Sequence, residues 1–484
     1  MPLLEALLAW ERAGLCSFHT PGHRQGREVA PEVAALLPER LFRLDATELE
    51  GLDDLHNPAG LIARAQRSLA ELYGAEESFF LVGGTTAGIL AAVLAAGGPG
   101  RKLLMARHSH RAAFAAAILS GCRVRYLPEE WTQESLPLGP LPEEAAAAVE
   151  EWRPGVLLLT RPNYYGIAVP LDEVAGACRR AGTVLVVDEA HGARWGPPGL
   201  PSALQAGADV VVQSAHKTLP ALTQGAWLHV QGPLVDRRRL RACLRVVQSS
   251  SPSYLLMVSL DVARWHLARW LAGAPGQVEQ ARRLRESLAG RGVPLLPRML
   301  PPGWVRDPFR LVVDASAMGR DGREVAAALR AAGMEVEWAE PDRVLILLGM
   351  RVERDARDLA DALGLLVGSL PMGAALGSPP ARAAGSRVGP YPRLEAVLDP
   401  APAWWADQEE VPLQQAPGRV AGEMIYLSPP GVPLVAPGER WTGEAVAFLR
   451  RCREAGLEAV GGTGPPAGPQ GEGERNLVRV VRET

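Results

Sequence analysis

The sequence predicts an α/β protein whose largest part is a mostly parallel β-sheet covered by helices on both faces. Between residues 60 and 230, short apolar runs alternate with stretches of helical periodicity. Such alternation is typical of parallel strands joined by helical crossovers. The 484 residues exceed one ordinary domain, and 47% hydrophobic against 22% charged residues suffices for a sizeable core. We therefore expect two or three domains.

The elements of this sheet are expected in a regular order. IARAQRSLAELYG (62–74) has apolar positions at helical spacing and ends at Gly74, a candidate C-cap. The strand SFFLVGG (78–84) and the Ala-rich helix TTAGILAAVLAAGG (85–98) follow. Further apolar strands are expected at RKLLMAR (101–107), CRVRYLP (122–128), GVLLLTRP (155–162), GTVLVVDEA (182–190) and DVVVQSA (209–215), with a helix at LDEVAGACRRAG (171–182).

The remainder of the chain predicts smaller parts. A long helix decorated with Arg and Glu covers 276–295, and a small α/β unit covers 308–368. The stretch 371–390 is rich in Gly, Ala, Pro and Ser, which is typical of a linker. The last 20 residues are expected to be loosely ordered. The predicted division is a large domain with its N-terminal segment (1–275), a small α/β domain (276–370), a linker (371–390) and a C-terminal domain (391–484).

Composition excludes several classes of protein. The net charge is −3 with no long charged run, which argues against a nucleic-acid partner. No apolar stretch is long enough for a membrane span, and the start, MPLLEALLAWERAG, lacks the basic lead of a signal peptide. Five scattered cysteines without CxxC spacing favour neither disulfides nor a zinc site. We expect a soluble cytoplasmic protein.

Lysine is scarce in this chain. Of 51 basic side chains, 49 are Arg and two are Lys, at positions 102 and 217. Only Lys carries an amine that can lose its proton and form a Schiff base. Lys102 lies in the exposed-looking GGPGRKLLM, whereas Lys217 lies in QSAHKTLPALTQ. Either both lysines simply remain in a sequence whose coding is biased toward Arg, or Lys217 was retained because its amine forms a Schiff base.

Two predicted strands end in residues that suit pyridoxal 5′-phosphate (PLP). Asp188 ends one strand, and Lys217 follows the end of the next, 29 residues later. Ligands of open α/β sheets bind at the carboxyl ends of strands. There a Lys can hold PLP covalently, while an Asp keeps the pyridine nitrogen protonated. The alternative for Asp188 is that it caps the following turn.

A phosphate cradle and a ring partner are also present. LVGGTTAGI (81–89) joins a strand to a helix through two glycines and two hydroxyls, so backbone N–H groups and the helix N-terminus can hold an anion. Alternatively, the glycines simply turn the chain. His108 and His110 follow the next strand. One of them can stack on a cofactor, or both are an exposed pair.

These residues lie within longer motifs that resemble the Orn/Lys/Arg decarboxylase family in its short form. The resemblance implies PLP fold type I: an aspartate aminotransferase-like large domain with a mostly parallel seven-stranded-type sheet, a small α/β domain and a C-terminal α+β domain. The motifs are FHTPGHRQGR (18–27), ELEGLDDLHNPAGLI (48–62), GAEESFFLVGGTTAGI (74–89), RPNYYG (161–166), DEAHGA (188–193), GADVVVQSAHKTLPALTQGAWLHV (207–230), QSSSPSYLLMVSLDVAR (248–264) and YLSPPGVPLVAPGE (426–439).

The resemblance also implies a role for each site residue. Lys217 is the Schiff-base lysine, Asp188 the partner of the pyridine nitrogen, and His216 a contact of the substrate carboxylate that helps proton transfer. Ser250 reaches the cofactor phosphate of the neighbouring subunit, which implies a homodimer with shared sites or a higher oligomer built from it. The remaining cofactor contacts are His110 stacked on the ring, Ala190 beneath it, and Thr85, Thr86 and Ser214 on the phosphate.

The activity implied is decarboxylation of a basic amino acid, with arginine favoured over lysine or ornithine because the chain has the short form. The alternatives are another PLP-dependent reaction, such as transamination or a lyase step, and a non-catalytic regulatory homologue. The chain departs from the family pattern at four positions, which leaves the substrate open: Val82 and His108 replace Asn, Asn163 replaces Thr, and Ala226 replaces Ser.

Overall fold

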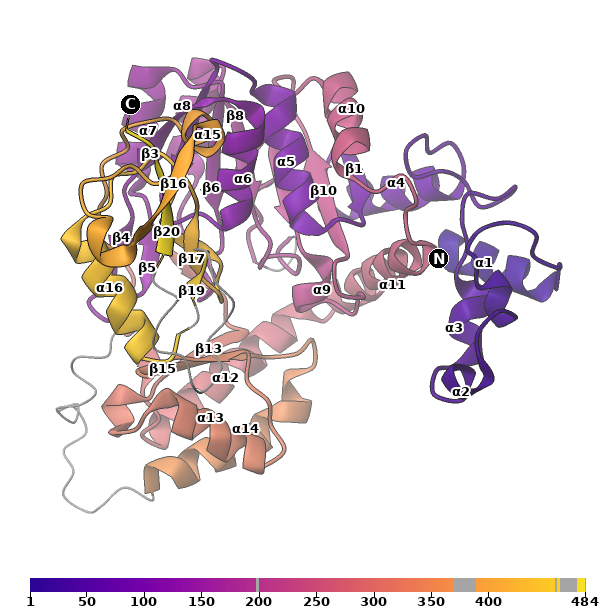
Figure 1. The fold of residues 1–484 in the computed structure, drawn as a ribbon. Helices are drawn as coiled ribbons and strands as arrows, with labels where there is room; N and C mark the ends of the chain where they lie inside the picture. Colours follow the sequence, from indigo (N-terminus) through magenta and orange to yellow (C-terminus); the bar gives the residue numbers. More distant parts are fainter. Residues whose placement is uncertain (197–199, 369–388, 458, 462–476, 484) are drawn as a thin grey trace. The chain divides into compact units, whose positions relative to one another are not determined.

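The computed structural model describes residues 1–196, 200–368, 389–457, 459–461 and 477–483 (Figure 1). The chain divides into two compact units, which are described separately below. The first consists of Met1–Ala96 and Gly182–Pro275, and the second of Gly97–Ala181 and Gly276–Thr484. The units therefore interleave along the chain, whereas the predicted domains were consecutive ranges. Most of the predicted linker lies outside the described residues.

A seven-stranded sheet contains every strand expected between residues 60 and 215. Its order is β1-β10-β9-β8-β6-β2-β3. β8 is parallel to β9, and β2 is parallel to both β6 and β3, which confirms the mostly parallel sheet. The strands are β1 (Glu77–Leu81), β2 (Lys102–Ala106), β3 (Arg123–Leu127), β6 (Val156–Thr160), β8 (Val184–Asp188), β9 (Val210–Gln213) and β10 (Ala226–Val230).

Strand β10 was not among the expected strands. It runs antiparallel to both β1 and β9, between which it lies. Only the short helix α9 (Ala215–Thr218) lies between β9 and β10. The sequence there lacks the long helical crossover that joins parallel strands, and the strand was therefore not predicted. All five of its residues are buried.

In the first unit, α5 (Gly84–Ala96) packs on the four strands β1, β8, β9 and β10 (Figure 1). Gly88 permits this approach, because a Cβ there would lie 2.5 Å from Cγ1 of Val212. Helix α4 (Leu61–Tyr73) ends at Gly74 in the left-handed conformation, as the sequence predicted. The other helices are α1 (Pro2–Arg12), η1 (Arg24–Gly26), α2 (Pro31–Ala34), α3 (Glu39–Leu44), α9 (Ala215–Thr218), α10 (Arg237–Val247) and α11 (Tyr254–Leu271).

The second unit adds a four-stranded antiparallel sheet of order β11-β13-β15-β14. It forms where the small α/β unit was expected. Its strands are β11 (Leu295–Leu296), β13 (Arg310–Asp314), β14 (Trp338–Ala339) and β15 (Arg343–Leu347). The helices that precede the C-terminal part are α6 (Arg111–Ser120), α7 (Pro142–Trp152), α8 (Asp172–Ala181), α12 (Ala274–Gly290), η2 (Ser316–Met318), α13 (Gly322–Ala331) and α14 (Val352–Gly368).

The C-terminal part has its own core around Leu434, Trp441 and Leu449. Residues 477–481 form a strand paired with β16 (Gln408–Pro412), so this part of the tail is ordered, contrary to the expectation. Val478 and Val480 are buried on either side of the exposed Arg479 and belong to that core. The elements are α15 (Pro400–Trp405), β16 (Gln408–Pro412), η3 (Leu413–Gln415), β17 (Ile425–Leu427), β18 (Val432–Val435), α16 (Gly443–Glu454), β19 (Ala459–Val460) and β20 (Leu477–Val481).

Two short two-stranded ribbons complete the second unit. They pair β4 (Glu130–Trp131) with β5 (Pro137–Gly139), and β7 (Ile167–Ala168) with β12 (Val305–Arg306). Across the described residues, no helix has both the length and the apolar character that a membrane crossing requires.

Candidate active site

Asp188 is the last residue of β8 and is 4% exposed. The strand VLVVD is buried throughout, so the carboxylate lies where the apolar core ends. One of its oxygens, Oδ1, accepts a hydrogen bond of 3.1 Å from the Ala190 N–H. Burial raises the pKa of Asp188, while the Lys217 charge and the Ala190 N–H act in the opposite direction. A buried carboxylate of this kind is stabilised by a cation placed against it, and a protonated pyridine nitrogen meets that need.

Lys217 lies in α9, which follows β9 directly. Its Nζ is 3.2 Å from Nε2 of His191, and its charge acts on Asp188. Asp188, His191 and Lys217, which follow the carboxyl ends of β8 and β9, thus lie close together within the first unit. The Lys217 side chain is exposed in the single chain, so its amine is accessible.

His191 is a candidate site residue that the sequence analysis missed. It lies three residues after Asp188, in the turn that follows β8. The rule that selected Asp188, a polar side chain at the carboxyl end of a predicted strand, applies equally to this histidine. The DEAHGAR motif therefore contained the signal.

The predicted phosphate cradle brings together hydroxyls from two elements. Gly84 has a φ of +70°, a left-handed conformation that glycine adopts without strain, and α5 starts there. Thr85 Oγ1 in the first turn lies 3.3 Å from Oγ of Ser214, the N-cap of α9. Thr86 follows and is exposed. Hydroxyls beside the N-terminus of a 13-residue helix fit a phosphate group.

His216 and Ala190 lie beside these groups in the first unit. His216 Nδ1 is 3.0 Å from the Gly225 carbonyl oxygen, which fixes the ring. Burial lowers the pKa of His216, which favours the neutral ring. Ala190 is buried next to Asp188. Its predicted place beneath the cofactor ring stays a prediction.

His110 belongs to the second unit, where it caps α6. Its Nδ1 accepts from the Ala112 N–H at 3.2 Å. The Arg111 N–H donates to the Gly431 carbonyl at 2.8 Å, and a Cβ on Gly431 would lie 2.8 Å from the His110 ring. The ring is thus held tightly by the helix start and by the 428–431 loop. Its stacking on the cofactor stays a prediction.

Ser250 is exposed in the segment before α11, as a contact to a neighbouring subunit would require. Tyr254, four residues later, is buried within its own chain. Its hydroxyl donates to the Asp53 carbonyl and, at 3.3 Å, to that of Leu52. Only the exposed end of SSSPSY is therefore free for such a contact.

Two of the four departures from the family pattern, Asn163 and Ala226, have local explanations. The hydrogen bonds at Val82 are made by its backbone and do not explain its side chain: its N–H donates to Gln248 Oε1 at 2.9 Å, and its carbonyl accepts from Gln224 Nε2 at 2.6 Å. Asn163 Oδ1 accepts from the N–H groups of Tyr165 and Ile167, which shapes the turn between β6 and β7. Ala226 is fully buried in β10, where no hydroxyl is needed.

Comparison with known proteins shows the family of the chain. The family model for the major domain of Orn/Lys/Arg decarboxylases matches residues 1–289, and the model for their C-terminal domain matches residues 395–462. The chain belongs to the Orn/Lys/Arg decarboxylase family. Membership confirms the predicted enzyme class, PLP-dependent decarboxylation of a basic amino acid, and PLP as the cofactor.

Individual relatives span nearly the whole chain. YaaO of Bacillus subtilis, itself uncharacterized, is 36% identical over 93% of this chain and 94% of its own. The arginine decarboxylase of Halalkalibacterium halodurans is 32% identical over 100% of this chain and 98% of its own. Among solved structures, the lysine decarboxylase LdcF of Francisella novicida has a TM-score of 0.82 at 17% identity, over 99% of this chain and 81% of its own. That likeness supports the fold.

Proposed function

We propose that this decarboxylase acts on L-arginine, releasing CO2 and agmatine as a step of polyamine biosynthesis. The observation that carries the proposal is the end-to-end similarity to the Halalkalibacterium halodurans arginine decarboxylase, 32% over the full chain. The buried Asp188 and the accessible Lys217 amine support the PLP chemistry that the reaction needs.

The described residues would hold different parts of the cofactor. PLP, when bound, supplies a ring that accepts the electrons of the broken Cα–carboxylate bond. Lys217 Nζ would hold it, and the Asp188 carboxylate would accept a hydrogen bond from its ring nitrogen. The hydroxyls of Thr85, Thr86 and Ser214 would bind the phosphate group, with Ser250 of a second subunit.

Proton transfer falls to the basic groups beside Asp188. His191 Nε2, 3.2 Å from Lys217 Nζ, is within reach to exchange a proton with that amine. The ammonium of Lys217, or His216 after its ring has taken up a proton at Nε2, would then return a proton to Cα. The way in which the site orients the substrate carboxylate would select this bond over the others at Cα.

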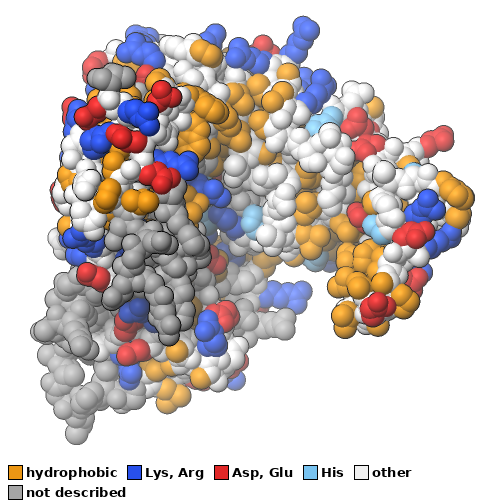
Figure 2. Space-filling view, in the orientation of Figure 1, with side chains coloured by type: hydrophobic (Ala, Val, Ile, Leu, Met, Phe, Trp, Pro, Cys, Tyr) orange, Lys and Arg blue, Asp and Glu red, His pale blue; other side chains and the backbone are white. Residues whose placement is uncertain are grey.

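We also propose that the active form is a cytoplasmic homodimer. Six large apolar side chains are exposed between residues 15 and 41, and Figure 2 shows hydrophobic side chains gathered on this N-terminal segment. Contiguous apolar surface of this kind favours contact with another protein. All five cysteines are free thiols, which suits a reducing compartment. The exposed apolar residues are Leu15, Phe18, Val33, Leu36, Leu37 and Leu41.

A substrate comparison tests the proposed reaction. CO2 release and amine formation are measured with arginine, lysine, ornithine and leucine at equal concentrations. We expect kcat/KM for arginine to exceed each of the others by at least about a hundredfold, which corresponds to roughly 2.7 kcal/mol. A preference for lysine or ornithine would overturn the choice of arginine, and no CO2 from any of them would overturn decarboxylation.

Borohydride reduction tests the attachment of the cofactor. We expect one labelled peptide, containing Lys217, and no label in Lys217→Ala. Lys102→Ala is the matched control and should keep the label, because the Lys102 amine donates to the Trp152 carbonyl at 2.8 Å. Label on the Lys102 peptide would contradict the assignment.

A further inference from the structure

A narrow cavity in the second unit is lined by rings from five separate stretches of sequence. Its interior offers about 20 Å³ to the centres of water-sized molecules, the space of a water molecule or one small headgroup. Besides the rings, its wall includes one carboxylate (Glu340), the last residue of β17 (Leu427) and the turn 428–430. The ring-bearing residues are His108, Trp131, Tyr165, Trp338 and Tyr391.

Three of these rings contact one another. The His108 ring centroid lies 5.2 Å from that of Trp131 and 4.9 Å from that of Tyr391, and the last two are 6.0 Å apart. Desolvation and the Arg107 charge lower the pKa of His108 to about 3, so the ring is neutral and does not repel a cation. His108 stands where the family usually has Asn, and it therefore adds a ring to this cluster. Clustered aromatic faces attract organic cations.

The single carboxylate in the wall is buried and incompletely paired. Glu340 is 5% exposed, and its Oε1 accepts from the Tyr165 hydroxyl at 2.8 Å. Its Oε2 lies 3.3 Å from Arg343 Nε, yet has no hydrogen bond of acceptable geometry to any residue that the structure describes. Burial and the Asp342 charge raise the pKa of Glu340, while the Arg343 charge and the hydrogen-bonding groups of Tyr165 and Trp338 act in the opposite direction.

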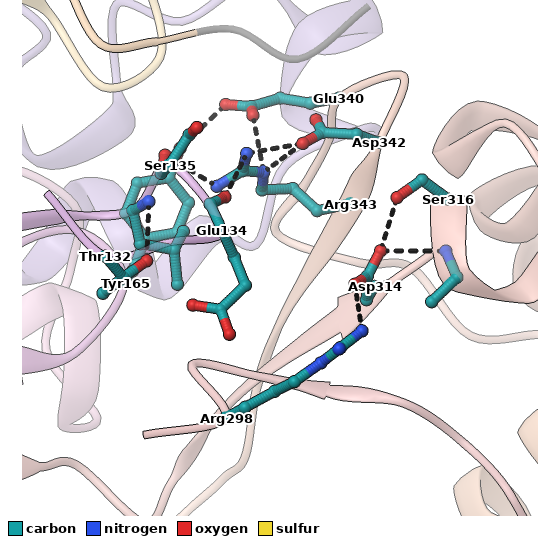
Figure 3. A network of polar contacts seen from close by, with 12 residues as sticks. Thr132, Glu134, Ser135, Tyr165, Arg298, Asp314, Ser316, Glu340, Asp342 and Arg343 are labelled. Carbon is teal, nitrogen blue, oxygen red and sulfur yellow. Dashed lines mark hydrogen bonds and ion pairs between the residues drawn. The ribbon is translucent and has the colours of Figure 1, made fainter. Parts of the chain in front are cut away.

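Arg343 does not neutralise this site, because it is shared. Figure 3 shows its guanidinium joined to both Glu340 and Asp342. Asp342 Oδ2 accepts from Arg343 Nε at 3.0 Å and from Nη2 at 2.5 Å. Two carboxylates therefore face one guanidinium, and the group carries one net negative charge when both are ionised.

The cavity shares its wall with the loops that hold His110. His108 precedes His110 by two residues, and Pro430 precedes Gly431, which contacts the His110 ring. A molecule in the cavity would touch both loops.

We propose that this cavity binds the guanidinium or ammonium end of an organic cation, with the rings enclosing the headgroup and Glu340 balancing its charge. The distal end of the substrate side chain and a free amine such as the product share this chemistry. Binding of the substrate side chain rests on the proposed function, whereas binding of a free amine does not.

Two probes of nearly equal shape, one charged and one neutral, measure how much the positive charge of the ligand contributes to binding. Butylguanidinium and butylurea are titrated into the holoenzyme and followed by calorimetry. We expect butylguanidinium to bind at least about tenfold more tightly than butylurea. Equal affinities would overturn the proposal.

Matched variants test the named residues. Glu340→Gln should weaken butylguanidinium binding by at least about tenfold, whereas Glu335→Gln, an exposed carboxylate of the same unit, should leave it unchanged. If Glu340→Gln does not fold, Trp131→Leu takes its place, with the exposed Trp405→Leu as its control. Unchanged binding in the folded pocket variant would overturn the proposal.

Kinetics with arginine separate the two sources. Competition with arginine, together with a raised KM in Glu340→Gln at unchanged kcat, assigns the cavity to the substrate side chain. Binding of the probe at saturating arginine assigns it to a free amine. Glu340-dependent binding in a protein that releases no CO2 would overturn only the proposed function. Decarboxylation of arginine without Glu340-dependent binding would overturn only this inference.

Discussion

Asp188 combines burial with a nearby amine, and its charge rather than its shape is what the cofactor requires. Asp188→Asn keeps the size of the side chain and removes the charge that favours a protonated ring nitrogen. We expect PLP still to bind, as seen in its absorbance, while kcat falls by about a hundredfold or more, equivalent to at least roughly 2.7 kcal/mol.

The control for this variant is Asp236→Asn. Asp236 is exposed and caps α10, and Asn caps a helix as well as Asp does, so its activity should match that of the unmodified enzyme. Near-normal turnover in Asp188→Asn would show that Asp188 only caps the turn to Ala190.

Helix α5 is held against the sheet closely enough that one methyl group matters. A Cβ at Gly88 would lie 2.5 Å from Val212 Cγ1 and 2.7 Å from Leu81 Cδ1. Gly88→Ala should therefore push α5 away from β9, cost about 1–3 kcal/mol of stability, and weaken PLP binding by separating Thr85 from Ser214. Thermal unfolding and PLP titration measure both effects.

Gly276→Ala is the counterpart of that variant, because a Cβ at Gly276 meets open space and its φ is not left-handed. It should be neutral or slightly stabilising. A Gly88→Ala protein with unchanged melting temperature and PLP affinity would disprove the link between the α5 packing and the cradle.

Strands β1, β10 and β9 share a buried polar chain that makes stability depend on pH. Ser78 Oγ lies 2.7 Å from His229 Nδ1, and His229 Nε2 lies 3.0 Å from Gln213 Oε1. Gln213 Nε2 donates to Glu189 Oε2 at 2.7 Å, next to Asp188. Burial lowers the pKa of His229 from 6.5 to about 3.

Between these two pKa values the unfolded chain binds a proton at His229 that the folded chain does not. Folding stability should therefore fall as the pH drops from 6.5 toward 3, by up to about 1.4 kcal/mol per pH unit from this residue. Urea unfolding at pH 7, 6 and 5 should show a flatter pH dependence in His229→Gln than in the unmodified protein. The exposed His266→Gln should retain the original slope, and equal slopes in all three proteins would contradict the assignment.

For the assembled enzyme, subunit mixing tests whether sites are shared. An inactive Lys217→Ala chain is mixed with a Ser250→Glu chain, whose added charge should repel the phosphate of a neighbour's cofactor. Tyr254 is left intact, because it is tied to Leu52 and Asp53 of its own chain. Random exchange should restore up to about a quarter of full activity, since half of the dimers are mixed and each contains one intact site.

Differently tagged chains must first show that subunits exchange, and each mutant must be inactive alone. With exchange proven, a mixture that recovers no decarboxylation would mean that each subunit builds a complete site.

The sequence by itself determined the strand–helix alternation, the parallel sheet and the family. It also indicated Asp188, Lys217 and the Thr85–Thr86 cradle. Each of these lies at a strand end or at the start of a helix, so its place follows from local periodicity and from the rule that ligands bind at the carboxyl ends of strands.

Tertiary structure alone decided the antiparallel insertion of β10, the pairing of Leu477–Val481 with β16, and the aromatic cavity around Glu340. His108, Trp131, Glu340 and Tyr391 lie up to 283 positions apart in the chain. No local pattern marks such residues, because their contacts arise only when separate elements bury their apolar faces against one another.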